Sequence, residues 1–535
     1  GQFFAQGNRI HWDHSVNFRN ALRGYLREVY DNDSHKLATA WGDEKLTFDT
    51  VETPSESDRE SSNPFLSPER PEDRRIIDVN RFWNLSAVRM LEHFARSFKD
   101  GIGRPALVSV YYNDIYGIPL GKSAAADLYR SPFIDGIVSC NSYGVERRPG
   151  ASGGNGSSAS IGLHGKFHLQ ELDYRTEYSF IRARGLDKNG IGATDGFEEH
   201  AAILQRDMSA ALALGQGAWI FALSGNAWSH PGFMRAIREM SLAARDCAVR
   251  PMPEDHAQIG VFADERMDYY LGSRNNFGKV YRIHHTNGPR YALARSGMSC
   301  DYYLLSDLTH PKRPAYKINV FLSASAISDA EISYVEKNLQ KDGNVLVFIS
   351  DSGRVAPGGF ENNIRRLTGL NIKMNPRKLV QQRYDPVLPK DSLFGDNPFT
   401  YSEGVGPEFE IGIMPGVQVL AYYSGTRKPA AVLKKHADWT AVYLALPGGV
   451  NPPLIRNLAK NAGLIPAGTV NNIVYSGNGV ISLHAGSSGR KTLHWQEKCD
   501  LFDLVQRRIV ASDVDSYTFD AQTGETRMFR RIPHE

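Results

Sequence analysis

Glu171, Asp173 and Arg175 stand at alternate positions near the end of residues 165–176, a short segment in which apolar and polar residues alternate. A period of two predicts a strand and places these three side chains on one face. A carboxylate two positions from a second acid and four from a guanidinium has its charge and orientation controlled by its neighbours. This pattern suits a nucleophile or a general acid/base. Taken without its context, the same pattern could equally form a solvated ion network on the protein surface.

The elements around this segment alternate between strands and helices. Strands are predicted at 106–112, 135–143, 165–171 and 217–223, and helices at 123–129, 198–214 and 234–245. Such alternation predicts a parallel sheet. A TIM barrel carries its site at successive strand ends, and here each strand is followed by polar or aromatic residues. These residues are Asn113, Asp114, Asn141, Ser142, Tyr143, Glu171, Asp173, Ser224, Asn226 and Trp228.

Four strands make only half of a TIM barrel. Residues 1–105 predict two amphipathic helices, 17–30 and 78–99, and a long polar loop at 41–75, but no convincing buried strand. We therefore expect a barrel domain over residues 1–250 that lacks its N-terminal strands. The missing half is expected to precede Gly1 or to come from another chain.

Two further domains are predicted after the barrel segment. Short apolar strands with intervening helices at 329–341 and 453–461 predict an open-sheet α/β domain over residues 251–464. Short β runs separated by turn residues predict a small antiparallel β sandwich over residues 465–535. Residues 351–360 lack the spacing of a phosphate loop and are interpreted as a plain loop.

The composition argues against several classes of function. The 62 basic and 59 acidic residues leave a net charge of +3, which gives no electrostatic footprint for nucleic acid or an anionic membrane. No apolar run approaches the roughly 18 residues that a membrane span needs. The four cysteines are far apart and form no CxxC pair, so no metal site and no cofactor are expected. The compartment stays open, with the cytoplasm or periplasm of a bacterium favoured.

Aromatic residues gather at the predicted strand ends, namely Tyr112, Tyr143, Trp219 and Trp228. Their flat faces, together with carboxylates, suit a carbohydrate substrate, although a core or rim position is the better interpretation of any single ring. Glycoside hydrolysis needs a second carboxylate, about 5 Å away for retention or roughly 6.5–9.5 Å for inversion. Asp114 and Glu44 are the two acids to consider as proton donors, and neither is a clean candidate. A loop cap explains Asp114 equally well, and Glu44 lies in the polar loop.

Five stretches of the chain carry a resemblance to a known family. They are residues 18–30 with Trp41 and Gly42, residues 131–135 with Tyr143, residues 163–176, residues 301–308 with 316–322, and residues 439–463. With these stretches the chain resembles the clan-A glycoside hydrolases close to the family 42 β-galactosidases, those that carry a β-galactosidase trimerisation domain.

The resemblance implies a retaining exo-glycoside hydrolase that acts on β-linked galactosides or related oligosaccharides and assembles as a homotrimer. Glu171 would be the nucleophile, oriented by Asp173 and Arg175. The acid/base glutamate would precede the segment that matches residues 18–26, and is therefore expected upstream of Gly1. The remaining substrate-binding residues would be Tyr143, Tyr112, Asn141, Trp219 and Trp228.

Two alternatives remain open at this point. A non-catalytic carbohydrate-binding or scaffold protein would keep the same fold without the proton donor. A hydrolase of another polysaccharide, such as a sulfated galactan, would be favoured by cationic side chains near the pocket, for which Arg147, Arg148 and Lys166 are candidates.

Overall fold

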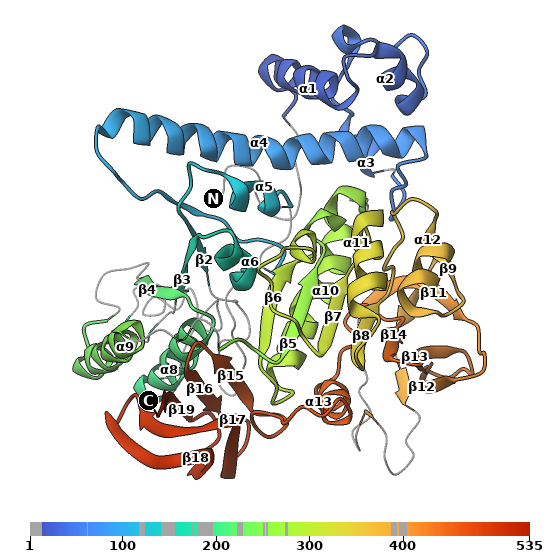
Figure 1. Cartoon of the computed structure of the whole chain (residues 1–535). Helices are drawn as coiled ribbons and strands as arrows, with labels where there is room; N and C mark the ends of the chain where they lie inside the picture. The colour runs from blue at the N-terminus through green and yellow to red at the C-terminus, as the bar shows by residue number, and fades with distance from the viewer. Residues whose placement is uncertain are drawn as a thin grey trace.

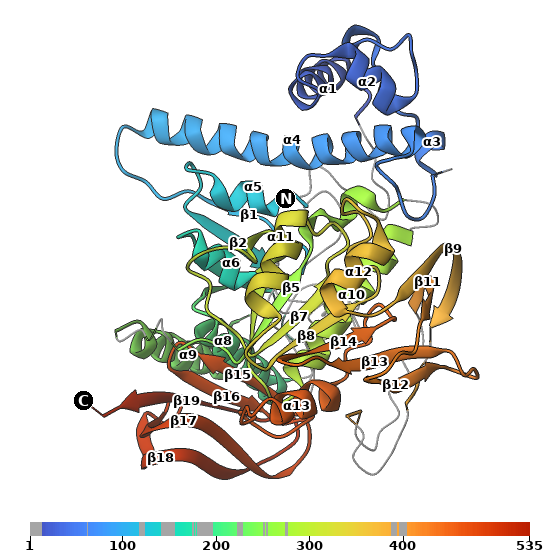
Figure 2. The same cartoon turned by 45° about the vertical axis from the view of Figure 1, so that its right-hand side comes forward.

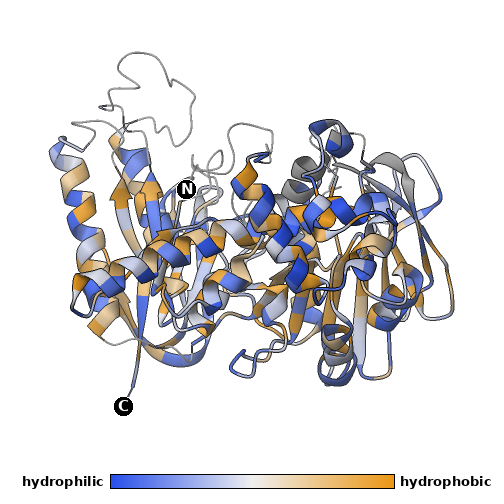
Figure 3. Ribbon diagram, turned by 90° about the horizontal axis from the view of Figure 1, so that it is seen from above, coloured by the Kyte–Doolittle hydropathy of each residue, from blue (hydrophilic) through white to orange (hydrophobic). Residues whose placement is uncertain are grey.

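The computed structural model describes residues 13–60, 62–116, 123–140, 156–173, 176, 178, 196–221, 228–249, 252, 255–272, 277–382, 384–386, 393–394 and 404–534. Three sheets carry most of the described architecture, and a group of helices near the N-terminus lies along one side (Figure 1). The helices show hydrophobic and hydrophilic residues in turn along their length, as amphipathic helices do (Figure 3).

The N-terminal helices form a small layer of their own. Ser15 caps α1 (Val16–Val29) by accepting a hydrogen bond from the backbone N–H of Phe18, and Asp33 caps α2 (Ser34–Trp41). The stretch predicted as a polar loop contains two short helices, η1 (Phe48–Thr50) and α3 (Glu56–Glu60). The long helix α4 (Pro71–Ile102) begins earlier than predicted, because Pro71 is suited to the first helical turn.

The four strands predicted in the first 250 residues form a parallel sheet in chain order, β1-β2-β3-β4. Its inter-strand contacts place Cys140 opposite Glu171, and Glu171 opposite Trp219. These four strands do not close into an eight-stranded barrel within the described part of residues 13–249. The strands are β1 (Ser109–Tyr111), β2 (Gly136–Cys140), β3 (Phe167–Asp173) and β4 (Gly217–Phe221), and the helices are α5 (Ala125–Arg130), α6 (Ser158–Leu163), α8 (Phe197–Ala213) and α9 (Pro231–Val249).

The second sheet is open, as predicted, with the strand order β10-β12-β13-β14-β8-β7-β5-β6. Strands β14, β8, β7, β5 and β6 are parallel, and β10, β12 and β13 extend one edge in antiparallel fashion. A separate ribbon of β9 and β11 projects beside that edge (Figure 2). The elements are β5 (Ile259–Ala263), η2 (Glu265–Tyr270), α10 (Phe277–Ala294), β6 (Cys300–Leu304), η4 (Leu305–Asp307), β7 (Ile318–Ser323), α11 (Asp329–Tyr334), η5 (Val335–Leu339), β8 (Asn344–Ile349), α12 (Phe360–Thr368), β9 (Ile372–Gln382), β10 (Tyr384–Pro386), β11 (Gly404–Ile411), β12 (Val417–Tyr423), β13 (Pro429–Lys435), β14 (Trp439–Leu444) and α13 (Pro452–Asn461).

The C-terminal strands form one five-stranded antiparallel sheet, so the predicted sandwich of two sheets is wrong for the described residues. Its order is β15-β16-β19-β17-β18, from β15 (Ile473–Gly477), β16 (Val480–His484), β17 (Gly489–Asp503), β18 (Arg508–Ala521) and β19 (Thr526–Pro533). The register of β17 shifts between His494 and Cys499, and such irregularities bend a strand. The bent sheet packs one apolar face on α8, through Tyr475 and Met528, and gathers the other into its own core.

The apolar cores cross both predicted domain boundaries. The largest cluster extends from Val88 in α4 to Ala459 in α13, so the barrel segment and the open sheet share one core. A second cluster joins α8 and α9 to the C-terminal sheet. The boundaries near residues 250 and 464 therefore mark changes of secondary-structure pattern within continuous packing, and as domain limits they stay a prediction.

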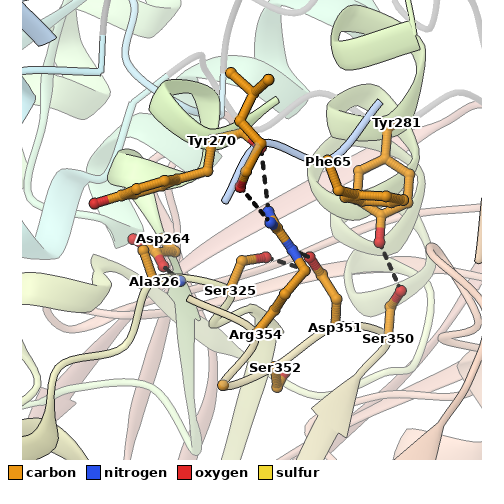
Figure 4. A network of polar contacts seen from close by, with 12 residues as sticks. Phe65, Asp264, Tyr270, Tyr281, Ser325, Ala326, Ser350, Asp351, Ser352 and Arg354 are labelled. Carbon is orange, nitrogen blue, oxygen red and sulfur yellow. Dashed lines mark hydrogen bonds and ion pairs between the residues drawn. The ribbon is translucent and has the colours of Figure 1, made fainter. Parts of the chain in front are cut away.

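A buried guanidinium ties the segment before α4 to the open sheet (Figure 4). Arg354 donates from Nε to Asp351 (2.8 Å) and from its two Nη groups to the backbone oxygens of Leu66 (3.1 Å) and Tyr270 (3.3 Å). The same guanidinium lies over the ring of Phe65 at 4.9 Å. The segment 351–360, predicted to be a plain loop, thus begins with a buried ion pair that joins distant parts of the chain.

Replacing Arg354 with methionine should destabilise the protein by about 3–5 kcal/mol, because Asp351 is fully buried and would lose its ionic partner. The matched control is Arg366→Met, since Arg366 pairs with Asp329 and Glu336 near the surface and its loss should cost about 1 kcal/mol or less. Equilibrium denaturation measures both. Equal losses for the two variants would contradict the structural role given to Arg354.

Glu265 is a buried acid at the first position of η2, two residues after the end of β5, where the barrel segment meets the open sheet. Neither of its carboxylate oxygens has a hydrogen-bond partner among the described residues. Burial, opposed by Arg266 and reinforced by Asp264, raises the pKa of Glu265 to about 7. In the unfolded chain the carboxyl returns to its ordinary pKa near 4.3. The folded state therefore binds the proton more tightly, and stability falls as the pH rises from about 4.3 to about 7.

The variant Glu265→Gln should remove this component of the pH dependence. Between pH 5 and pH 8 this variant should be more stable than the unsubstituted protein. The difference in the free energy of unfolding should grow with pH to on the order of 3 kcal/mol. Thermal unfolding at a series of pH values provides the measurement, with Glu361→Gln, an exposed site in α12, as the control. Parallel stability–pH curves for Glu265→Gln and the unsubstituted protein would show that Glu265 does not carry the effect.

Candidate active site

Glu171 lies at the carboxyl end of β3 and is 7% exposed. Its neighbours across the parallel sheet are Cys140 on β2 and Trp219 on β4, so the three side chains share one face. Tyr111, on β1, donates its phenol hydrogen to Glu171 Oε1 over 3.3 Å. The carboxylate thus has neighbours on each of the other three strands.

Tyr111 is a residue that sequence reasoning missed. Burial, together with the neighbouring Cys140 and Glu171, raises the pKa of Tyr111 well above its ordinary value, so the phenol keeps its proton and acts as a donor. Asn113 fixes the adjacent strand end, since it donates to Cys140 Sγ (3.2 Å) and accepts from the Cys140 backbone N–H (3.0 Å). The period of two along β1 puts Tyr111 and Tyr112 on opposite faces, but it does not say which of the two faces Glu171.

Tyr112 was predicted to bind substrate, and the structure places it elsewhere. Its side chain is buried in the large apolar cluster between the barrel segment and the open sheet, on the side of β1 opposite Tyr111. Trp228 was predicted as a sugar platform. It packs against His200 (ring centroids 4.7 Å apart) and Phe233 (6.0 Å), beside the apolar cluster of α8 and α9. Tyr112 therefore lies away from the face of Glu171, whereas the role predicted for the partly exposed Trp228 stays a prediction.

Asp173 and Trp219 lie on the same face as Glu171. Asp173 is buried and stands opposite Phe221 on β4. Trp219 is 39% exposed, and its ring meets that of Phe221 edge-on at 5.7 Å. A partly exposed indole beside a carboxylate is a surface on which the C–H face of a sugar can stack. Arg175, Tyr143 and Asn141 fall outside the described residues, as do Arg147 and Arg148.

The two acids considered as proton donors, Asp114 and Glu44, differ in their surroundings. Asp114 is fully buried and accepts hydrogen bonds from the Tyr129 hydroxyl (2.7 Å), the Ser157 N–H (2.6 Å) and the Tyr116 N–H (3.0 Å). It is therefore a loop cap. Glu44 is exposed just after α2.

Lys166, the candidate cation for a sulfated ligand, is at the start of β3, the opposite end from Glu171. Its ammonium group donates to the backbone oxygens of Ser131 (2.6 Å) and Ile134 (2.7 Å). This lysine therefore fixes the connection between α5 and β2 and gives no support for a sulfated galactan.

The histidines near β3 are also engaged in structural contacts. His168 shares a hydrogen bond of 2.7 Å with Ser139 on the helix side of the sheet, and burial lowers its pKa to about 4. His164 contacts Asp307 at 2.9 Å. Among the residues that the structure describes, no three His, Cys, Asp or Glu side chains are arranged to hold a metal ion. Within the same residues, no helix combines the length and the apolar character required to span a bilayer.

No family model and no curated protein matches the sequence. Solved structures do match, over nearly the whole chain. A β-galactosidase from Bacillus circulans sp. alkalophilus has a TM-score of 0.66 at 15% identity, covering 97% of this chain and 77% of its own. Gan42B, a GH42 β-galactosidase from G. stearothermophilus, has a TM-score of 0.63 at 13% identity, with the same coverage of 97% and 77%. A β-galactosidase from the haloarchaeon Halorubrum lacusprofundi has a TM-score of 0.62 at 14% identity, covering 98% and 77%.

At these identities the likeness is one of fold. The chain has a mixed α/β architecture similar to that of GH42 β-galactosidases, and the resemblance noted in the sequence is confirmed at this level. The four-stranded parallel sheet of the first 250 residues fits a TIM-barrel-like domain.

Proposed function

We propose that the protein is a retaining exo-glycoside hydrolase that acts on β-linked galactosides or related oligosaccharides, with Glu171 as its nucleophile. The observation that carries this proposal is the setting of Glu171 at a strand end. A phenol donor, Tyr111, bonds its carboxylate, and a partly exposed indole, Trp219, stands beside it. The fold, similar to that of β-galactosidases over 97% of the chain, supports the choice of substrate class.

In the proposed mechanism Glu171 attacks the anomeric carbon, so that a bond forms from its carboxylate oxygen to C1 as the bond from C1 to the leaving oxygen breaks. Water then cleaves the glycosyl ester and restores the carboxylate with net retention of configuration. Tyr111 positions the carboxylate by donating to Oε1. Trp219 stacks on the sugar, and Asp173 accepts hydrogen bonds from its hydroxyls. Arg175, Tyr143 and Asn141 stay in the proposed substrate-binding set from the resemblance alone.

The first step also needs a proton for the leaving oxygen. Asp114 caps a loop and Glu44 is exposed just after α2, so we assign the acid/base to a carboxyl outside the described residues. Strand β1 lies at an edge of its sheet as described. A strand paired along that edge would bring its carboxyl end to the side of Tyr111, where catalytic groups of such sheets gather. The proposal also keeps the homotrimer, for which the family resemblance is the only support.

A second candidate is a non-catalytic carbohydrate-binding protein on the same fold. The observation that favours it is that Asp114 serves as a loop cap. The described part of the site then contains no demonstrated proton donor. The two candidates differ in whether Glu171 forms a covalent bond to a sugar.

A mechanism-based reagent with a good leaving group tests the nucleophile without requiring the proton donor. With 2,4-dinitrophenyl 2-deoxy-2-fluoro-β-galactoside, the departing phenolate needs no protonation and the fluorine slows release of the glycosyl ester. We expect one sugar per chain, attached to the peptide that contains Glu171, as read by mass spectrometry. Glu171→Gln should abolish the labelling, and Glu361→Gln should retain it. Labelling of another carboxylate, or none at all, would refute the assignment.

Loss of the phenol at position 111 should leave the nucleophile poorly positioned. Because Tyr111 holds Oε1 in place for attack, Tyr111→Phe should slow labelling of Glu171 by about tenfold or more.

Tyr112→Phe is the matched control, because the Tyr112 hydroxyl has no hydrogen-bond partner among the described residues. Its labelling rate should stay within about twofold of the unsubstituted protein. If the two variants behave alike, Tyr111 does not position Glu171.

A further inference from the structure

A cleft of about 350 Å³ lies between the N-terminal half of α8 and the turn that joins β18 to β19. The helix contributes Phe197, Glu198, Ala201 and Gln205, and the turn contributes Gln522 and Thr523. A helix that follows a strand in a parallel sheet returns in the opposite direction, so the first turns of α8 lie toward the end of β3 that carries Glu171. The cleft is therefore outside the candidate active site but on the same end of the sheet.

Hydrogen bonds hold the walls of the cleft in place. Thr526 Oγ1 donates to the backbone oxygen of Ala202 over 2.7 Å and so fixes the turn against α8. Glu525 accepts from the Gln522 backbone N–H (2.9 Å) and pairs with Arg527 (2.8 Å). Ser488 bonds both Gln522 Oε1 (3.1 Å) and the Thr523 hydroxyl (3.2 Å). A site with walls fixed in advance loses little freedom when a ligand binds.

The spacing of the helix residues suits a ligand of one or two sugar rings. Glu198 and Gln205 are seven positions apart and so lie on the same side of α8, separated by about 10 Å along its axis. The small side chain of Ala201 lies between them and leaves the floor open. Phe197 supplies an aromatic ring at one end, held by an edge contact with Phe233 at 5.7 Å.

The lining also restricts the chemical class of the ligand. None of the nine residues that line the cleft is basic, which argues against phosphate and sulfate groups. The charge of Glu525 is already paired with Arg527. What remains is a set of amide, hydroxyl and carboxylate groups around one ring, and this combination suits an uncharged ligand rich in hydroxyl groups.

We infer that this cleft is a second carbohydrate site, which binds one or two rings of an uncharged galactose-containing chain separately from the sugar that occupies the site at Glu171. The inference rests on the proposed function for its ligand class. It adds to that function a second point of attachment for galactose-containing oligomers and polymers.

The inference is tested by calorimetric titration of the Glu171→Gln protein with β-1,4-linked galactotetraose, since this variant should bind without turnover. We expect two binding events per chain. Adding Gln205→Ala and Thr523→Ala should weaken one of them at least tenfold, and Ala201→Trp, which fills the cleft, should have the same effect. Thr492→Ala, at a partly exposed threonine on β17 that does not line the cleft, is the control and should leave both events unchanged. Thermal unfolding of each variant establishes that it is folded.

The outcomes separate the two proposals. A single binding event in the Glu171→Gln protein, or two events that the cleft substitutions do not change, would overturn the second site while labelling of Glu171 by the fluoro-sugar still stands. Failure of that labelling would refute the proposed hydrolase independently of the titration. Binding of a tetralysine peptide in place of galactotetraose would show that the cleft takes a cationic ligand and would also overturn the inference.

Discussion

The parallel pairing of β3 with β2 and β4 is the constraint on which the candidate site depends. It places Glu171 between Cys140 and Trp219, and it turns His168 and Leu172 toward the helices on the other side. A slip of one residue would exchange these faces, because side chains alternate along a strand. The apolar contacts of Leu172 with the cluster of α8 therefore help to keep the carboxylate on the correct face, although Leu172 touches no substrate.

Patterns local to the chain predicted much of the fold. The period of two around Glu171 predicted β3 and its facing residues, and the apolar stripes of residues 17–30 and 78–99 predicted α1 and most of α4. The prediction failed where long-range packing decides. Tyr111 and Tyr112 are adjacent and alike in type, and only the pairing with β2 and β3 shows which one meets Glu171.

The two other differences have the same origin. The short β runs after residue 465 predict two sheets, but they are stretches of longer strands that bend within one sheet, and bending depends on the partner strands. Asp351 reads locally as part of a polar loop. Its importance comes from Arg354, which reaches backbone atoms at Leu66, nearly three hundred residues earlier in the chain. Residue types in a short window carry no information on such contacts.

The position of α8 has a consequence for synthesis in the cell. This helix is buried between the sheet that carries Glu171 and the last sheet of the chain, and Thr526 bonds to its backbone. Chains emerge from the ribosome N-terminal end first, at about 5–20 residues per second. The apolar face that α8 presents to β15 and β19 thus stays exposed until the final strands have been released. We therefore expect molecular chaperones to bind nascent chains that are halted before residue 526.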